Sequence, residues 1–301
     1  MKYAASVDIG GTSTRVALIS QTGEIIERQS FTTLGDNPHA TLEGIYDIIQ
    51  GFSEPCVGVG VSCPGPLDLK KGIVLTPPNL TGWHYFKFKE EAEKLWNLPV
   101  ILENDANLAG YAEAMKGAGV GEDVVQYFTI STGLGGGLVI NENIFLGSHG
   151  FAQEVANAIL WKDGPQLGDL KPGSVESICS GTAITQRAKQ QGLDAQHAGD
   201  VYQLAQSGNM VAEAIIDDAI EYLANMIAIV IGVIDPGVVV LGGGVALKIP
   251  NFVEKVTKRV QTKVYAVQVE NVNIKRAELG DDNGLIGGGL YAFNVFAGGM
   301  I

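Results

Sequence analysis

Apolar and polar residues alternate along this chain in patterns that predict a mixed α/β protein. Short runs in which every residue, or every second residue, is apolar indicate strands, whereas apolar residues three or four positions apart indicate helices. The first part of the chain predicts three strands in succession and then strands that alternate with helices. The strands are expected at residues 3–8, 14–20, 25–31, 57–62 and 100–103, and the helices at 37–51, 86–96 and 105–115. Asp36 or Asn37 is available to cap the first helix.

The same order of elements begins again after a glycine-rich crossing at residues 115–122. Strands are expected at 124–130, 136–140, 144–146, 238–241 and 272–275, an irregular stretch at 151–171, and helices at 180–191, 201–207, 211–232, 252–260 and 285–296. Strands that alternate with helices are typical of α/β sheets. We therefore predict two α/β lobes. The N-terminal lobe spans 1–115 and is joined by the C-terminal helix, 285–301, and the C-terminal lobe spans 116–284.

Two glycine-rich turns have the chemistry of phosphate-binding loops. Gly10, Gly11 and Thr12 lie between the first two strands of the first lobe, and Thr132 and Gly133 open a similar turn in the second. Glycine allows a ligand to approach the bare backbone closely, and successive backbone N–H groups in such a turn bind anions. The repetition of the turn in both lobes predicts a polyphosphate ligand.

Composition and charge narrow the class of protein. The chain has 301 residues, with 20 lysines and arginines against 33 aspartates and glutamates, and its net charge is −13. This charge argues against a nucleic-acid partner and against an anionic membrane surface, so local amides, a metal ion and a few cations must bind any phosphate.

The cysteines and the apolar stretches predict a cytoplasmic protein. Cys56, Cys63 and Cys179 form no CxxC pair, which fits a reducing compartment. A strand is expected from Tyr3 onward, so we expect no signal peptide. The most apolar stretch, residues 226–240, is interrupted by Asp235-Pro236 and is too short to cross a bilayer.

Two aspartates at strand ends are candidates for phosphate chemistry. Asp8 ends the first strand beside the first glycine turn, where it either holds Mg²⁺, directly or through water, or stabilises its own turn. Asp105 follows a buried strand and begins a helix, where it either aims a hydroxyl oxygen at a γ-phosphoryl group or serves, like Asn104, as an N-cap. Arg15 reaches either a phosphate or solvent.

Other phosphate-binding and hydrolase motifs are absent from the sequence. It contains no Walker A loop, no dinucleotide-binding GxGxxG after the first strand and no serine nucleophile elbow. The run Gly133-Leu134-Gly135-Gly136-Gly137 is followed by an expected strand rather than a helix, which disfavours a Rossmann fold.

Several motifs, in order along nearly the whole chain, resemble the ROK family of sugar kinases and repressors. They are Asp8-Ile9-Gly10-Gly11-Thr12, Glu103-Asn104-Asp105-Ala106-Asn107, Thr132 to Gly137, Gly147 to Glu154, Gly173-Ser174-Val175-Glu176 with Ser180 to Ile184, Asp235-Pro236 through Gly244, and Leu279 to Gly287. This resemblance implies the actin-like ATPase (ribonuclease H-like) fold, in which two duplicated α/β lobes enclose a cleft for ATP and sugar.

The resemblance also implies roles for individual residues. Asp105 would be the general base on the 6-hydroxyl of the sugar. Sugar contacts would come from Gly65, Asn79, Asn104, Glu154 and Glu176, the last on the anomeric side. Phosphates and Mg²⁺ would be bound by Asp8, Gly10, Gly11, Thr12, Thr132 and Gly133, with Gly243 and Gly244 against the adenosine.

The sequence departs from the family pattern beside the sugar site. Most members have a histidine three residues after the glutamate, followed by a CxCGxxGCxE run that binds structural zinc. Here Asn157 and Ser174 stand at the histidine and the last cysteine, so we expect no zinc. Asn157 is smaller and would fit a substituted anomeric oxygen or a 2-acetamido group. Gln153 replaces a usual glycine.

The resemblance leaves the sugar and the class of function open. Glucose, a β-glucoside and N-acetylmannosamine are all candidates, and the missing zinc run favours the β-glucoside type. A repressor of the family would carry an N-terminal helix-turn-helix, which is not expected here. A non-catalytic sugar sensor is disfavoured by Asp8, Asp105 and both glycine turns. Members are often dimers through the second lobe, so a homodimer is expected.

Overall fold

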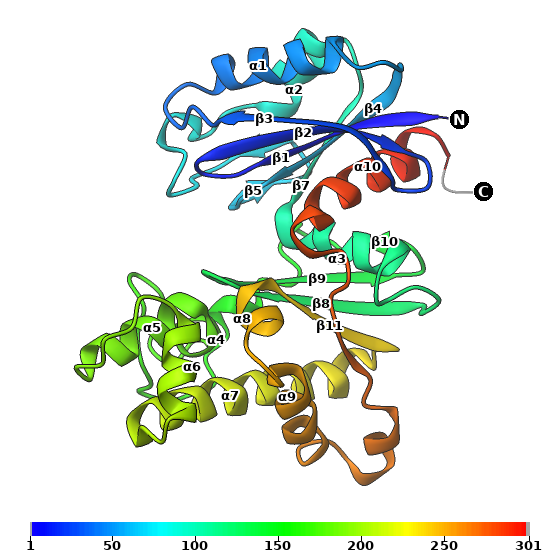
Figure 1. The fold of residues 1–301 in the computed structure, drawn as a ribbon. Helices are drawn as coiled ribbons and strands as arrows, with labels where there is room; N and C mark the ends of the chain where they lie inside the picture. The colour runs from blue at the N-terminus through cyan, green and yellow to red at the C-terminus, as the bar shows by residue number, and fades with distance from the viewer. Residues whose placement is uncertain (1, 299–301) are drawn as a thin grey trace. The chain divides into compact units, whose positions relative to one another are not determined.

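The computed structural model describes residues 2–298, and the chain divides into two compact units. The first unit consists of Met1–Lys116, Leu146–Gly150 and Asp281–Ile301, and the second of Gly117–Phe145 and Phe151–Gly280. Each unit contains one five-stranded sheet with helices packed against it (Figure 1).

The sheet of the first unit has the strand order β3-β2-β1-β4-β7. Its strands are β1 (Tyr3–Ile9), β2 (Ser13–Ser20), β3 (Ile25–Thr32), β4 (Cys56–Cys63) and β7 (Val100–Asn104). The first three form an antiparallel meander, because short turns join them, whereas β4 and β7 run parallel to β1 after longer crossovers. β5 (Leu67–Asp68) and β6 (Ile73–Val74) form a separate two-stranded ribbon.

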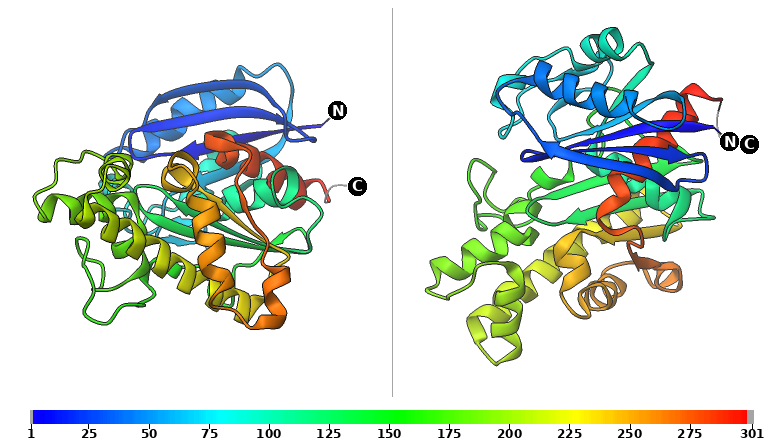
Figure 2. Two further views of the ribbon diagram at one scale, coloured as in Figure 1. Left: turned by 60° about the horizontal axis from the view of Figure 1, so that its bottom comes forward. Right: turned by 45° about the horizontal axis from the view of Figure 1, so that its top comes forward.

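Helices cover both faces of this sheet, since alternate residues of a strand point to opposite faces. α1 (Pro38–Gln50) and α2 (Phe88–Trp96) lie on one face, where Ala5, Val7 and Ile9 of β1 join the core. α3 (Asp105–Lys116) and α10 (Asn283–Phe296) lie on the other face (Figures 1 and 2). The short 3-10 helices η1 (Thr81–Trp83) and η4 (Gly280–Asp282) precede α2 and α10.

Glycines allow α10 to lie directly on the sheet. A Cβ atom at Gly60 of β4 would lie 2.0 Å from the carbonyl oxygen of Gly288, and one at Gly287 would lie 2.0 Å from the carbonyl oxygen of Leu108 in α3. The glycines of the final helix therefore serve close packing, as the sequence predicted.

The second unit repeats this architecture with the strand order β10-β9-β8-β11-β12. Its strands are β8 (Val124–Ile130), β9 (Leu134–Ile140), β10 (Asn143–Ile144), β11 (Val238–Gly242) and β12 (Ile274–Arg276). Again three antiparallel strands precede two that run parallel to the first. The predicted α/β class is confirmed, and the strand order and directions of the two sheets show the duplication directly.

The helices of the second unit pack mainly around α7, which is long and largely apolar. They are α4 (Val175–Cys179), α5 (Gly181–Gln190), α6 (Ala198–Gln206), α7 (Met210–Ile234), α8 (Gly243–Lys248) and α9 (Phe252–Gln261), with 3-10 helices η2 (Val155–Asn157) and η3 (Ala266–Asn271). Phe128 and Ile130 of β8 and Leu241 of β11 share one buried core with these helices.

Most differences from the predicted elements are short or lie at ends. Asn37 caps α1, because its side chain accepts a hydrogen bond from the N–H of Ala40 at 3.1 Å. The helix predicted from residue 86 begins at Phe88, and the strand predicted from 136 begins at Leu134, inside the glycine run. α4 and α8 were not predicted, because a single turn or two of helix has no readable periodicity.

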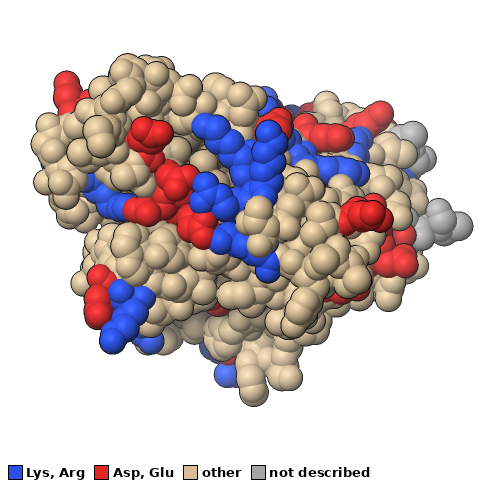
Figure 3. All heavy atoms as spheres, turned by 90° about the horizontal axis from the view of Figure 1, so that it is seen from below, with Lys and Arg blue, Asp and Glu red and all other residues tan. Residues whose placement is uncertain are grey.

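Charged side chains on the second unit are extensively paired. In a view from below Figure 1, the side on which α7 and α9 lie, Lys and Arg form a band bordered by Asp and Glu (Figure 3). Arg259 binds Asp217 at 2.8 Å and also binds Glu221, which in turn binds Lys263. Within residues 2–298, no helix is both long enough and apolar enough to span a membrane.

The close contact between Gly60 and α10 predicts that a side chain at residue 60 will destabilise the protein. Gly60→Ala should destabilise the protein by at least about 2 kcal/mol, since backbone atoms of α10 cannot yield to the new methyl group. Gly51→Ala is the matched control, because that exposed glycine at the end of α1 has φ = −84° and an added Cβ would lie 3.4 Å from its nearest atom, an ordinary contact. The control should gain about 0.5–1 kcal/mol. Urea unfolding of both variants would measure the difference, and equal stabilities would contradict the packing argument.

Candidate active site

The carboxyl ends of β1, β4 and β7 place polar side chains in one row. The parallel register pairs Asp8 with Ser62 and Ser62 with Glu103, and neighbours in register project from the same face of a sheet. A Cβ at Gly284, in the first turn of α10, would lie 3.5 Å from Oδ1 of Asp8 and 3.7 Å from Oγ of Ser62. The row therefore lies under the start of α10, at the strand ends where α/β proteins bind ligands.

Both carboxylate oxygens of Asp8 accept hydrogen bonds. Ser62 Oγ donates to Oδ1 at 2.9 Å, and Arg15 donates to Oδ2 from Nε at 3.0 Å and from Nη2 at 2.6 Å. Arg15 also approaches Asp282, which binds Arg28 at 2.7 Å. Arg15 is thus part of an ion-pair network.

The fit of this site to Mg²⁺ follows from those contacts. Mg²⁺ keeps several of its waters and is bound by one or two carboxylates together with substrate phosphates. Because both oxygens of Asp8 are already engaged, the side chain suits contact with Mg²⁺ through water. In the described part of the chain, no three or more His, Cys, Asp or Glu side chains are grouped to hold a metal ion.

The first glycine turn is exposed and lies against Asn79, a residue that we predicted to bind the sugar. Gly10 N–H donates to the carbonyl of Ser13 at 2.9 Å, which closes the turn, and Gly11 and Thr12 face solvent. A Cβ at Gly11 would lie 3.1 Å from Cβ of Asn79. The structure therefore brings together the turn and Asn79.

Asn104 and Asp105 lie at the junction of β7 and α3. Oδ1 of each accepts a hydrogen bond from the N–H of Ala106 at 2.9 Å. Asn104 directly precedes α3 and binds the N–H two residues further on, which is an N-cap contact, whereas Asp105 is the first residue of the helix. Asp105 nevertheless remains exposed. A Cβ at Gly65 would lie 3.7 Å from Nδ2 of Asn104, which places Gly65 beside this pair.

Burial, and then the charges of Asp105 and Asp8, raise the pKa of the Cys63 thiol far above its ordinary value.

Glu103, which the sequence singled out only as part of a motif, is a buried carboxyl group. It is 1% exposed, and its Oε1 accepts hydrogen bonds from Asn104 N–H and from Asn107 Nδ2, both at 2.8 Å. Burial raises the pKa of Glu103 to about 7, although both hydrogen bonds favour the charged form. The half-buried Tyr291 of α10 has its pKa raised to about 12 by burial and by the charge of Glu103.

In the second unit, Glu176 of α4 is bound to the second glycine turn. Its Oε2 accepts a hydrogen bond from Leu134 N–H at 2.8 Å, and a Cβ at Gly133 would lie 2.9 Å from the same oxygen. Glu154 lies near enough for its pKa to be raised, first by desolvation and then by the charge of Glu176. One of the two predicted sugar-binding carboxylates is therefore bound to the glycine turn, and its charge acts on the other.

The replacement at residue 153 has a visible structural basis. Gln153 adopts φ = +71°, a left-handed conformation that glycine accepts without strain, which accounts for the usual glycine. Its Oε1 accepts a hydrogen bond at 2.7 Å from Nε2 of Gln126, a fully buried side chain of β8. This bond offsets part of the conformational cost and fixes the residue that precedes Glu154.

Direct contacts hold the segment from Asn157 to Ser174. Ser174 is buried and donates to Ser177 Oγ at 2.8 Å, and a backbone bridge joins it to Ile159. Trp161 stacks on Tyr222 of α7 with ring centroids 4.8 Å apart. Asn157 is exposed in η2.

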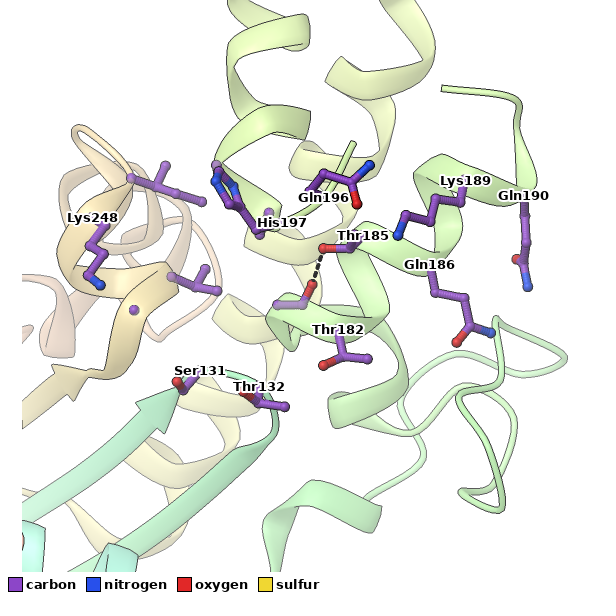
Figure 4. Close-up of a pocket in the computed structure, with 16 residues that line it drawn as sticks. Ser131, Thr132, Thr182, Thr185, Gln186, Lys189, Gln190, Gln196, His197 and Lys248 are labelled. Carbon is purple, nitrogen blue, oxygen red and sulfur yellow. Dashed lines mark hydrogen bonds between the residues drawn. The ribbon is translucent and has the colours of Figure 1, made fainter. Parts of the chain in front are cut away.

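A large pocket opens beside the second glycine turn. Its volume is about 950 Å³, and its walls include Thr132, Thr182 of α5 and Gly244 of α8 (Figure 4). A Cβ at Gly243, where φ = +82°, would lie 2.4 Å from the carbonyl oxygen of Ile130, whereas Gly244 has no atom within 4 Å of such a position. Polar side chains also line the pocket, together with the apolar Val245 and Ile249; the polar ones include Gln186, Lys189, Gln190, Gln196, His197 and Lys248.

Duplicated α/β units with a glycine turn in each define a member of the actin-like ATPase fold. The chain matches the ROK family over residues 4–293, and it belongs to that family. The predicted family and fold are thereby confirmed.

Named relatives are similar over almost the full chain. A glucokinase of Thermotoga maritima is 30% identical, over 93% of this chain and 94% of the relative. An N-acetylmannosamine kinase of Yersinia pestis is 29% identical, over 97% and 99%.

Solved structures give the same picture. The ROK hexokinase from Thermus thermophilus superposes with a TM-score of 0.91 at 29% identity, covering 99% of this chain and 100% of its own. A ROK family glucokinase from Streptomyces griseus, solved with glucose and AMPPNP, gives a TM-score of 0.74 at 27% identity, with coverage of 99% and 100%.

The buried Glu103 predicts a pH-dependent stability. Its folded pKa of about 7 lies above the ordinary value of 4.5, so its favourable contribution is complete below pH 4.5 and is lost as the pH rises through 7. Glu103→Gln removes this titration. The variant should therefore gain stability relative to the parent between pH 4.5 and 7, by at most about 3 kcal/mol. Urea unfolding at a series of pH values measures the difference, and a constant difference across that range would contradict the assignment.

Proposed function

We propose that this ROK family protein is an ATP-dependent sugar kinase that transfers the γ-phosphoryl group to the 6-hydroxyl of a hexose or hexose derivative. The observation that supports this proposal most directly is the position of Asp105, an exposed carboxylate at the carboxyl end of β7 beside Asn104 and Gly65. The named kinase relatives match the chain over almost its full length, and this supports the same reaction class.

On the sugar side, Asp105 would be the general base. It would accept the proton of the 6-hydroxyl and aim the oxygen at phosphorus, a step in which positioning supplies most of the catalysis. Asn104, Asn79 and Gly65 of the first unit would contact the sugar. From the second unit, Glu154, Glu176 and Asn157 would do so as well.

On the nucleotide side, the pocket of the second unit would bind the adenosine of ATP. Its volume of about 950 Å³ exceeds what a nucleoside requires, and Gly244 leaves one wall open to close approach. Thr132 and Gly133 would bind phosphates there, with Gly243 behind them.

The first glycine turn and Asp8 would complete the phosphate site. Gly10, Gly11 and Thr12 would bind phosphate, and Asp8 would hold Mg²⁺ through water. The metal would supply charge neutralisation of the phosphates, while the side chain sets where its waters lie.

The physiological sugar remains a choice among glucose, a β-glucoside and N-acetylmannosamine. Relatives carry the names of glucokinase and N-acetylmannosamine kinase. Exposed Asn157 beside the Glu154 segment is compatible with a larger substituent near carbon 1 or carbon 2.

The protein would act in the cytoplasm as a homodimer formed by its second unit. Ile229 and Val233, one helical turn apart on α7, are 54% and 77% exposed. Two apolar side chains of this kind on one helix face support an interface.

Substitution of the base tests the proposed reaction. Asp105→Asn keeps the shape of the side chain but cannot accept the proton, so kcat should fall by about 10²–10⁴-fold. A coupled assay with ATP and the three sugars measures kcat and KM for both proteins. Turnover of the variant within a few-fold of the parent would show that another group is the base, and a parent inactive on every sugar would favour a sensor.

The dimer can be tested on the same helix. Val233→Glu should halve the mass measured by light scattering, because a charge would be buried at the interface. Met210→Glu, at the other end of α7 and 81% exposed, should leave the mass unchanged. A parent that elutes as a monomer would refute the interface.

A further inference from the structure

The strand–helix junction that carries Asp105 is held by a side chain no sugar or nucleotide would touch. Glu103 lies two residues before Asp105, is 1% exposed, and projects from the face of the sheet that α10 covers. Its Oε1 accepts a hydrogen bond from the backbone N–H of Asn104, the residue directly before Asp105.

The same oxygen also reaches into the helix. Asn107 Nδ2, in the first turn of α3, donates to Oε1 of Glu103 at 2.8 Å. One carboxylate oxygen therefore joins the last peptide of β7 to the first turn of α3. The position of Asp105 between these two anchors is thereby fixed.

The energetics argue that this group does more than fill space. Burial of a carboxyl group is costly, and a well-packed apolar side chain of similar size is often neutral or stabilising in its place. Asn107 adds a second buried polar group, and its Oδ1 has no hydrogen-bond partner. Because the buried pair of Glu103 and Asn107 costs stability, we infer that its role is to fix the geometry of the β7–α3 junction.

We propose that Glu103 is a positioning residue for the phosphoryl transfer, which it serves by fixing the Asn104–Asp105 backbone through its hydrogen bond to Asn104 N–H. This inference rests on the proposed role of Asp105 as the general base. Displacement of a catalytic group by about 1 Å can cost 10²-fold in rate, so loss of the anchor should act on kcat.

Two substitutions at the same position separate geometry from folding. Glu103→Met has similar length and no acceptor, so the folded variant should show kcat reduced about 10–100-fold, with KM for MgATP unchanged within twofold. Glu103→Gln keeps an oxygen that can accept both hydrogen bonds, and it should retain kcat within threefold of the parent. Circular dichroism and thermal unfolding confirm that each variant is folded at the assay temperature.

A buried hydroxyl elsewhere in the sheet is the matched control. Ser20 is the last residue of β2, at the end of the strand away from the first glycine turn. It is fully buried, and its Oγ accepts a hydrogen bond from the N–H of Glu24 at 3.1 Å. Ser20→Ala should lower stability without change in kcat.

The outcomes distinguish this inference from the proposed function. A folded Glu103→Met enzyme with kcat within threefold of the parent, while Asp105→Asn is inactive, would overturn the positioning role alone. Equal losses of kcat in the Met and Gln variants would also overturn it, because the acceptor would then not be the cause. An active Asp105→Asn enzyme would instead overturn the base assignment.

Discussion

Parallel pairing of β1, β4 and β7 is the constraint on which the chemistry of the first unit depends. Because the three carboxyl ends share one edge, Asp8, Ser62 and Glu103 fall into register, and the first glycine turn and the Asp105 junction leave the sheet at that edge. The close approach of α10, made possible by Gly60 and Gly288, then covers the row and removes Glu103 from water. The register of the parallel strands and the close packing of α10 together determine which groups surround Asp8 and Asp105.

The second unit uses the same architecture but differs in what its polar groups do. Glu176 binds the backbone of its own glycine turn, and Gln153 holds a left-handed conformation that costs about 1–2 kcal/mol in a non-glycine residue. The hydrogen bond from buried Gln126 returns about 1 kcal/mol of that cost. Local strain is thus carried by the segment that directly precedes Glu154.

Periodicity and motifs predicted the two α/β lobes and most strands, because β-strands and glycine turns leave local signals. The pairing of Arg15 with Asp8 could also have been found, since a tight turn between β1 and β2 sets these residues opposite each other. Other features depend on distant parts of the chain. Asp282 reaches Arg15 across 267 positions, and the register of Ser62 with Glu103 follows from crossovers whose geometry no local pattern encodes. The helices α4 and α8 were not predicted because they are too short for apolar residues to recur at helical spacing.

The first unit is assembled from three separate stretches of sequence, and its last helix is made after the whole of the second unit. During synthesis on the ribosome, the face of the first sheet that α10 covers therefore stays uncovered until residues 283–296 have been made. Ala4, Ala17 and Ile19 on that face stay without their helical partner until then. Since domains generally fold as the chain emerges, the second unit can fold first, and the sheet edge that carries Asp8 and Glu103 is covered only when α10 emerges.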